Sequence, residues 1–122
     1  MTLQPRPAIE IPQLIAPLVV AGVAILLLAA LREPTRQRFS AIIIAGAGAA
    51  YISGGLGPWE FAFCAVMTVV AFRGLTDYRW IGAGWLMHSA WDVLHHLYGN
   101  PIIPIAPLSS FGCAVCDVAL AV

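Results

Sequence analysis

The segment 80–98 holds all three histidines of the protein together with one acidic residue. On a helix of about 3.6 residues per turn, Asp92 lies about 40° around the axis from His88, and His95 lies about 20° away on the other side. His96 follows at about 80°, at the edge of the same face. The spacing therefore predicts a polar stripe in which His88, Asp92 and His95 point in one direction.

These residue types at these spacings are typical of metal sites. A carboxylate and an imidazole three or four residues apart on a helix can reach one ion, as in di-metal bundles and helical zinc motifs. Two further acids, Glu60 and Asp117, are expected on neighbouring helices near the same pocket, and such a set suffices for one Zn or Fe ion with an open coordination position. We therefore predict metal ligation by His88, Asp92, His95 and His96, and catalytic roles for Asp92, Glu60 and Asp117.

Other roles for these groups stay open at this point. Aligned Asp and His side chains also form proton relays, and a membrane histidine can hydrogen-bond a neighbour simply to hold helices together. Glu60 follows Trp59 at a helix start, where an acid complements the helix dipole. Cys113 and Cys116 are interpreted as small packing residues, because the pair lies in an apolar segment without a second such pair.

The composition indicates a membrane protein. Of the 122 residues, 61% are hydrophobic and 10% are charged, whereas an average soluble domain is about 25% charged. A globule of this length has too little interior for so much apolar surface, and intrinsic disorder is excluded by the same numbers. The net charge of zero excludes a nucleic-acid partner, which requires a basic excess. The lipid bilayer is the expected partner.

Long uncharged segments predict the architecture. Ile11–Leu31 and Phe39–Trp59 are each 21 residues long and contain no charged residue, and about 20 residues of helix cross a bilayer core of about 30 Å. We expect an all-α, polytopic transmembrane helix bundle that forms a single integral membrane domain over residues 1–122. It has about five short spans, or four if the last is not a full span: 11–31, 39–57, 59–75, 80–98 and 107–122.

The arginines predict the orientation. Five of them lie in the two loops that follow the first and third spans, and only Arg6 lies on the other side. Positively charged loops stay in the cytoplasm, so we expect a multi-pass protein of the cell inner membrane with its N-terminus outside. The loops at Gly54–Pro58 and Gly99–Pro104 then form the outward mouth of the polar pocket.

Small residues recur every four positions in the second span. Gly46, Ala50 and Gly54 would let a neighbouring helix approach closely. Because five short spans make a thin bundle, this face is expected to pair with a second copy, and the protein is predicted to be a homo-oligomer.

Three sequence stretches carry a resemblance to a known group of proteins. The runs Gly-Leu-Gly-Pro-Trp-Glu at 55–60, Gly-Trp-Leu-Met-His-Ser-Ala-Trp-Asp-Val-Leu-His-His at 84–96 and Asn-Pro-Ile-Ile-Pro at 100–104 resemble an uncharacterised family of small bacterial integral membrane proteins, over about residues 40–122. This resemblance implies a fold and a location but no activity. In addition, residues 92–96 resemble one histidine box of membrane di-iron hydroxylases and desaturases, and Trp59-Glu60 is similar to the Trp-Glu of fungal membrane-bound terpene cyclases.

Four functions fit these observations. The preferred interpretation is a metal-dependent membrane enzyme that acts on a lipid-soluble, lipid-like small molecule. The alternatives are a proton- or metal-ion-coupled carrier, a metal-free acid–base enzyme similar to an isoprenoid cyclase, and a structural accessory subunit.

Overall fold

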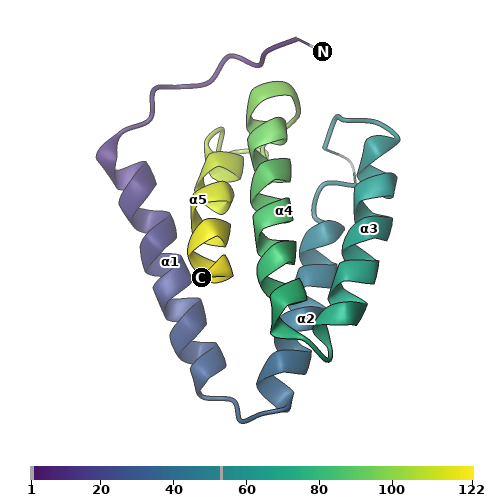
Figure 1. The fold of residues 1–122 in the computed structure, drawn as a ribbon. Coiled ribbons are helices and arrows are strands. Elements are labelled where there is room, and N and C mark those ends of the chain that lie inside the picture. The colour runs from purple at the N-terminus through teal and green to yellow at the C-terminus, as the bar shows by residue number, and fades with distance from the viewer. Residues whose placement is uncertain (1, 53) are drawn as a thin grey trace.

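The computed structural model describes residues 2–52 and 54–122. Within these ranges the chain forms five α-helices and no strands (Figure 1), which confirms the all-α prediction. The helices are α1 (Ile11–Ala29), α2 (Thr35–Gly48), α3 (Trp59–Gly74), α4 (Tyr78–Tyr98) and α5 (Ser109–Ala121).

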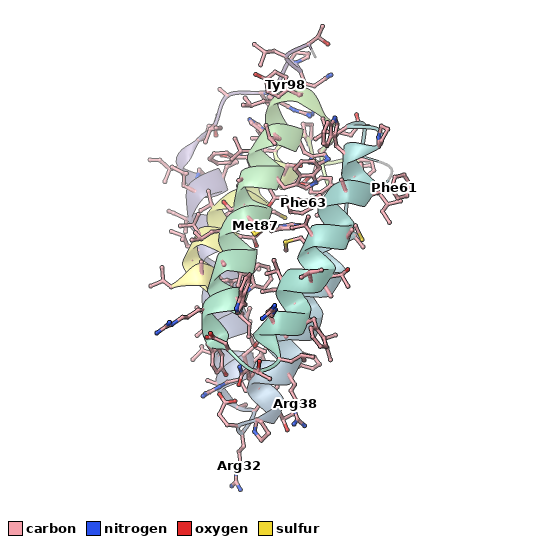
Figure 2. The ribbon with its side chains drawn as sticks, turned by 45° about the vertical axis from the view of Figure 1, so that its right-hand side comes forward. Arg32, Arg38, Phe61, Phe63, Met87 and Tyr98 are labelled. Atoms are coloured by element: carbon pink, nitrogen blue, oxygen red, sulfur yellow. The ribbon has the colours of Figure 1, made fainter. Side chains whose placement is uncertain are left out.

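Successive helices run in alternating directions (Figure 1). The α1–α2 and α3–α4 connections lie at one end of the bundle, and the α2–α3 and α4–α5 connections lie at the other. Helix α5 packs between α1 and α4, while α2 packs on α3 and α4. Figure 2 shows Arg32 and Arg38 at the first end and Tyr98 at the opposite end. The arginine-bearing loops therefore share one end of the molecule.

The helix over the second predicted span is shorter than the span. The prediction was 39–57, but α2 begins at Thr35 and ends at Gly48, and turns occupy residues 49–52. Ser53, inside the predicted span, lies outside the described residues. Glycines inside a helix cost about 1 kcal/mol each relative to alanine, and Gly46 and Gly48 stand in the last turn of α2. The early end has a consequence for the site, because it releases Tyr51 from the helix.

A small apolar core holds α2, α3 and α4 together near the arginine-bearing end. Ile44, Met67 and Trp85 belong to it. Two glycines allow the close approach: a Cβ atom added at Gly48 would overlap the Met67 side chain, and one at Gly84 would lie 2.8 Å from Ile44 Cγ2.

The outer surface of the bundle is strongly apolar. In α1, Ala21 is buried, whereas Leu18, Leu26 and Leu27 are 52%, 72% and 69% exposed. By length and composition α1 is the one described helix that could cross a membrane; α5 is also apolar but has only 13 residues. A single apolar helix near an N-terminus is also a property of signal sequences.

Candidate functional site

Helix α4 carries the polar stripe that its sequence predicts. The helix is 21 residues long and is capped by Asp77, whose carboxylate accepts a hydrogen bond from the Arg79 backbone N–H at 2.9 Å. Its residues His88, Asp92 and His95 are 3%, 0% and 0% exposed. All three therefore point into the bundle, where each needs a polar partner from another element.

His88 is bound on both sides of its ring. Its Nδ1 lies 2.6 Å from Asp117 Oδ2 on α5 and 3.2 Å from Asp92 Oδ2. Its Nε2 lies 2.8 Å from the carbonyl oxygen of Ala47 on α2. Because a carbonyl only accepts, Nε2 carries a proton and donates it. His88 thus joins α2, α4 and α5.

The short contact between His88 and Asp117 contains one proton. Either Nδ1 donates to the Asp117 carboxylate, or the protonated carboxyl donates to Nδ1; the charge of the group is the same in both cases. With Asp92 ionised, the group of His88, Asp92 and Asp117 carries one net negative charge. A buried net charge is costly, so either a second proton or a metal cation would neutralise this group.

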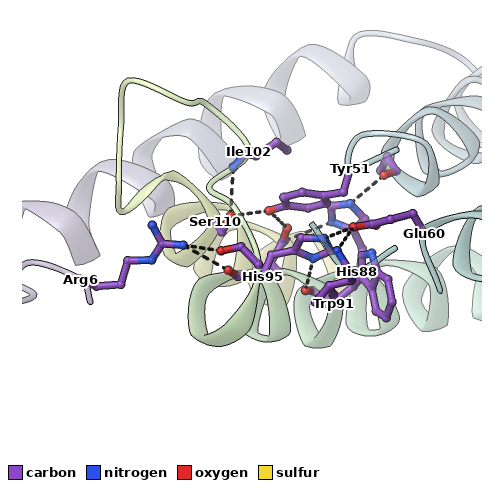
Figure 3. A network of polar contacts seen from close by, with 12 residues as sticks. Arg6, Tyr51, Glu60, His88, Trp91, His95, Ile102 and Ser110 are labelled. Atoms are coloured by element: carbon purple, nitrogen blue, oxygen red, sulfur yellow. Dashed lines mark hydrogen bonds and ion pairs between the residues drawn. The ribbon is translucent and has the colours of Figure 1, made fainter. Parts of the chain in front are cut away.

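Tyr51 and Ser110 complete the surroundings of Asp92. The Tyr51 hydroxyl donates to Asp92 Oδ1 at 2.7 Å and also lies 2.7 Å from Ser110 Oγ. A phenol has a single proton, so the Ser110 hydroxyl is the donor of the second contact. Ser110 Oγ in turn accepts from the Ile102 backbone N–H at 3.1 Å. Figure 3 shows this chain of contacts from the α4–α5 loop into the site.

His95 forms a second pair nearly two turns further along α4. Its Nδ1 donates to the carbonyl oxygen of Trp91 at 2.9 Å, and its Nε2 lies 2.7 Å from Glu60 Oε1 on α3. Glu60 is 2% exposed, and its Oε1 also accepts from the Leu56 backbone N–H at 3.1 Å. One proton lies between His95 Nε2 and Glu60 Oε1, so the pair is neutral as a whole whichever partner holds it.

Aromatic rings enclose the two pairs. The Tyr51 ring stacks on His95 with a centroid distance of 3.7 Å and an interplanar angle of 16°. Trp91 meets the His95 ring edge-on at 5.2 Å and stacks on Phe63 at 4.4 Å. Figure 2 shows Phe63 directed toward α4 and its neighbour Phe61 directed away from the bundle. Tyr51 therefore touches both histidine sites.

One of the two sites has the donor set for a metal ion. Donor atoms of His88, Asp92 and Asp117 all lie within 4.8 Å of one another, and the buried Asp92 Oδ2 has no hydrogen-bond partner. Donors on a tetrahedral Zn²⁺ with bonds of ~2.0–2.1 Å lie ~3.3 Å apart. The distance of 3.2 Å between His88 Nδ1 and Asp92 Oδ2 fits, and the Asp117 carboxylate needs to withdraw by only ~0.7 Å.

The structure divides the predicted site. Asp92 and His88 are together as expected, but their third partner is Asp117, while His95 pairs with Glu60. The described residues place His95 and His96 outside the group that could hold a metal. His96 is half-buried against Phe111 at 5.7 Å, and its Nδ1 has no hydrogen-bond partner. The physical reason is position along α4: His95 lies nearly two turns from His88, which is too far for one ion.

Sequence reasoning missed three contributors to the site: Tyr51, Ser110 and the carbonyl of Ala47. Tyr51 lies in a stretch predicted to be lipid-spanning helix, and a backbone carbonyl has no sequence signature. Cys64, Cys113 and Cys116 are free thiols, so the described residues contain no disulfide at the predicted Cys-x-x-Cys segment.

Arg6 also has a role that its sequence position does not reveal. Its guanidinium donates to the backbone carbonyls of His96 at 3.0 Å and Gly99 at 2.8 Å. The backbone N–H of Gln4 donates to Leu97 O at 2.7 Å. Helix ends leave carbonyls without partners, and the N-terminal segment supplies those partners for α4. It therefore holds the end of the helix that carries His95.

Comparison with known proteins assigns the chain to a family. Residues 12–122 match the model of a family of unknown function (DUF6010). The chain therefore belongs to this family. No curated protein and no solved structure gives a significant match, so the site has to be interpreted from its own geometry.

Proposed function

We propose that the protein is a polytopic membrane protein whose core binds a divalent cation in exchange for a proton. The distribution of polar residues supports a lipid environment. The apolar side chains of α1 face outward, and Trp59, Phe61 and Phe72 of α3 are 65%, 63% and 71% exposed. The ionisable groups of the helix interiors are instead buried and paired, as in membrane proteins.

The proposed orientation follows from the shared end of the arginine-bearing loops. With five arginines at that end, the positive-inside rule places the α1–α2 and α3–α4 loops in the cytoplasm. The N-terminal segment and the Tyr51 turn are then on the outer side of the inner membrane.

The observation that carries the function is the donor set of the His88 group, one imidazole and two carboxylates that are all buried. When His88 and Asp117 share one proton and Asp92 is a carboxylate, the group has one net negative charge. A divalent ion bound by neutral His88 and the two carboxylates gives a neutral site. Binding therefore releases one proton for each M²⁺ taken up. A donor set of one imidazole and two carboxylates suits Zn²⁺ or Fe²⁺.

The cavities favour ion binding over catalysis on a lipid-like molecule. An apolar groove of about 460 Å³ runs past Ser89, Ala114 and Val118, which neighbour the site in sequence. His88, Asp92 and Asp117 do not line this groove and are themselves buried. A substrate of lipid size would contact almost only apolar side chains there, while a single ion fits between the three groups.

Elemental analysis of the detergent-purified protein tests the proposal. We expect about one Zn or Fe per chain, and loss of that metal in Asp92→Asn. Asp77→Asn is the matched control, because Asp77 caps the exposed start of the same helix. Sealed vesicles with the protein should take up the metal and acidify the outside. Metal binding without uptake would favour the enzyme, and absence of metal in the parent would contradict the proposal.

Self-association is a separate proposal. Gly46 in the last turn of α2 and Ala50 just after it are exposed, and nothing lies within 4 Å of a Cβ added at Gly46. The predicted third member, Gly54, is buried beyond the end of α2, so only the surface at Gly46 and Ala50 is free for a second copy. Gly46→Leu should weaken association measured by analytical ultracentrifugation in detergent, and an unchanged oligomer would contradict the proposed interface.

A further inference from the structure

The buried group of His88, Asp92 and Asp117 lies close to a water-accessible cavity. This cavity of about 270 Å³ lies between the two outer loops, lined by Ala50, Tyr51, Gly54, Asn100–Ile102 and Pro104. Asn100 and Pro104 are exposed, so the cavity is open to solvent. Its volume holds several water molecules at ~30 Å³ each. Tyr51 is the residue that belongs both to this cavity and to the surroundings of Asp92.

The Tyr51 side chain separates the cavity from the metal-binding group. Tyr51 is 3% exposed, and the Asp92 behind it is 0% exposed. The phenol ring stacks on His95, and its hydroxyl donates to Asp92 Oδ1. The ring is therefore the wall between water and the carboxylate.

We infer that Tyr51 is the gate through which a cation enters and leaves the site of His88, Asp92 and Asp117. The inference rests on the proposed function, since it concerns access to that same site. Rotation of one side chain would join the cavity to Asp92. Tyr51 follows the end of α2 at Gly48, so its backbone lies in a turn and is not held by the hydrogen bonds of a helix.

The hydroxyl and the ring of Tyr51 have separable effects. The hydroxyl binds Oδ1 of Asp92 and thereby leaves Oδ2 directed toward His88. Loss of a group that orients a metal ligand commonly lowers metal affinity by about 10- to 100-fold. The ring blocks passage, so its loss should accelerate exchange. Tyr51→Phe tests the first effect, and Tyr51→Ala tests both together.

Thiol accessibility measures the gate without a metal. Ser110→Cys places a reporter directly behind Tyr51, in a chain with Cys64, Cys113 and Cys116 changed to Ser. We expect 2-aminoethyl methanethiosulfonate, added from the outer side of vesicles, to modify this thiol at least tenfold faster in Tyr51→Ala. Tyr51→Phe should stay near the parent rate. Tyr78→Phe is the matched control, because Tyr78 lies at the other end of the bundle and bonds Glu33.

A second reporter covers the case in which Ser110→Cys does not fold. Native Cys113 lies one turn further along α5, and it can be probed after only Cys64 and Cys116 are changed to Ser. In whichever single-cysteine protein folds, equal modification rates with Tyr51 and with Tyr51→Ala would contradict the proposal that Tyr51 is the gate.

Metal exchange then separates the gate from the function. With Zn²⁺ bound, we expect release to a chelator to be at least tenfold faster in Tyr51→Ala than in Tyr51→Phe. If the parent binds no metal but thiol access depends on Tyr51, the proposed function fails and the gate stands. If metal binds and neither access nor release depends on Tyr51, the gate fails and the proposed function stands.

Discussion

The two histidine sites of α4 have the same parts but different charge balances. In each, one ring nitrogen donates to a backbone carbonyl and the other meets a buried carboxylate at 2.6–2.7 Å. The His95 site has one carboxylate, Glu60, and is neutral when the two partners share one proton. The His88 site has two, Asp92 and Asp117, and keeps one net negative charge when one proton is bound.

This difference distinguishes a structural pair from a binding site. In an apolar interior a neutral, hydrogen-bonded pair needs no further partner, whereas removal of either member leaves a buried charge that destabilises the fold. With the extra carboxylate at His88, the buried Asp92 Oδ2 has no hydrogen-bond partner. A bound cation would supply that partner. Under the proposed function, the His88 group is therefore the cation site, and the His95 pair is expected to position the helices.

The largest expected effect compares one carboxylate from each site. Asp117→Asn should lower metal affinity by more than the ~100-fold typical of lost supporting contacts, because a direct ligand is removed. Glu60→Gln should leave affinity within a few-fold of the parent. Isothermal titration with Zn²⁺ in detergent measures both. A loss of binding in Glu60→Gln equal to that in Asp117→Asn would show that the two sites are one.

The second prediction concerns stability. Glu60→Gln removes the carboxylate that His95 Nε2 meets at 2.7 Å, and breaking a buried ion pair costs about 3–5 kcal/mol. Replacement of both partners, Glu60→Leu with His95→Leu, should cost less than Glu60→Gln alone, because no unpaired charge is left in the core. Thermal unfolding in detergent compares the variants. Equal stability of Glu60→Gln and the parent would contradict an ion pair at this site.

The third prediction compares a glycine packed against the His95 site, Gly54, with an exposed glycine, Gly46. A Cβ atom at Gly54 would lie 3.0 Å from His95 Nε2 and 2.9 Å from the carbonyl oxygen of Tyr51. Gly54→Ala should therefore lower stability by about 1–3 kcal/mol, as overpacking does, while metal affinity changes little. Gly46→Ala is the matched control, because a Cβ there meets open space. Thermal unfolding and zinc titration together read the outcome, and an unaltered melting temperature in Gly54→Ala would contradict the tight packing.

The smallest effect is expected for Glu33, an exposed carboxylate in the loop at the opposite end of the bundle from Glu60. Glu33 accepts hydrogen bonds from Tyr78 and from Arg36, and these contacts, the Tyr78 bond first, hold the pKa of Glu33 below its ordinary value of 4.5. A lowered pKa in the folded state stabilises the protein above pH 4.5, and this contribution is lost as the pH falls through the lowered pKa. Because Glu33 is on the exposed surface, Tyr78→Phe should change the acid unfolding profile only slightly. A large change would show that an exposed contact stabilises the protein as much as the buried pair of His95 and Glu60, which would contradict the role given to burial.

The sequence by itself determined the helical class and the polar face of α4. Charged residues are rare and clustered at segment ends, so the helices are recognisable from composition. The spacing of His88, Asp92 and His95 places them on one face, because a helix repeats about every 3.6 residues. These properties are local, and no packing is needed to produce them.

Only the tertiary structure decided which acid meets which histidine. Asp117 and Glu60 are distant in sequence from α4, and their heights depend on where α3 and α5 begin and on how the glycines let the helices approach. The early end of α2 brought Tyr51 into the core as the link between the two sites. Such pairings arise from packing between helices, where a displacement of one turn, about 5.4 Å, changes the partner of every side chain.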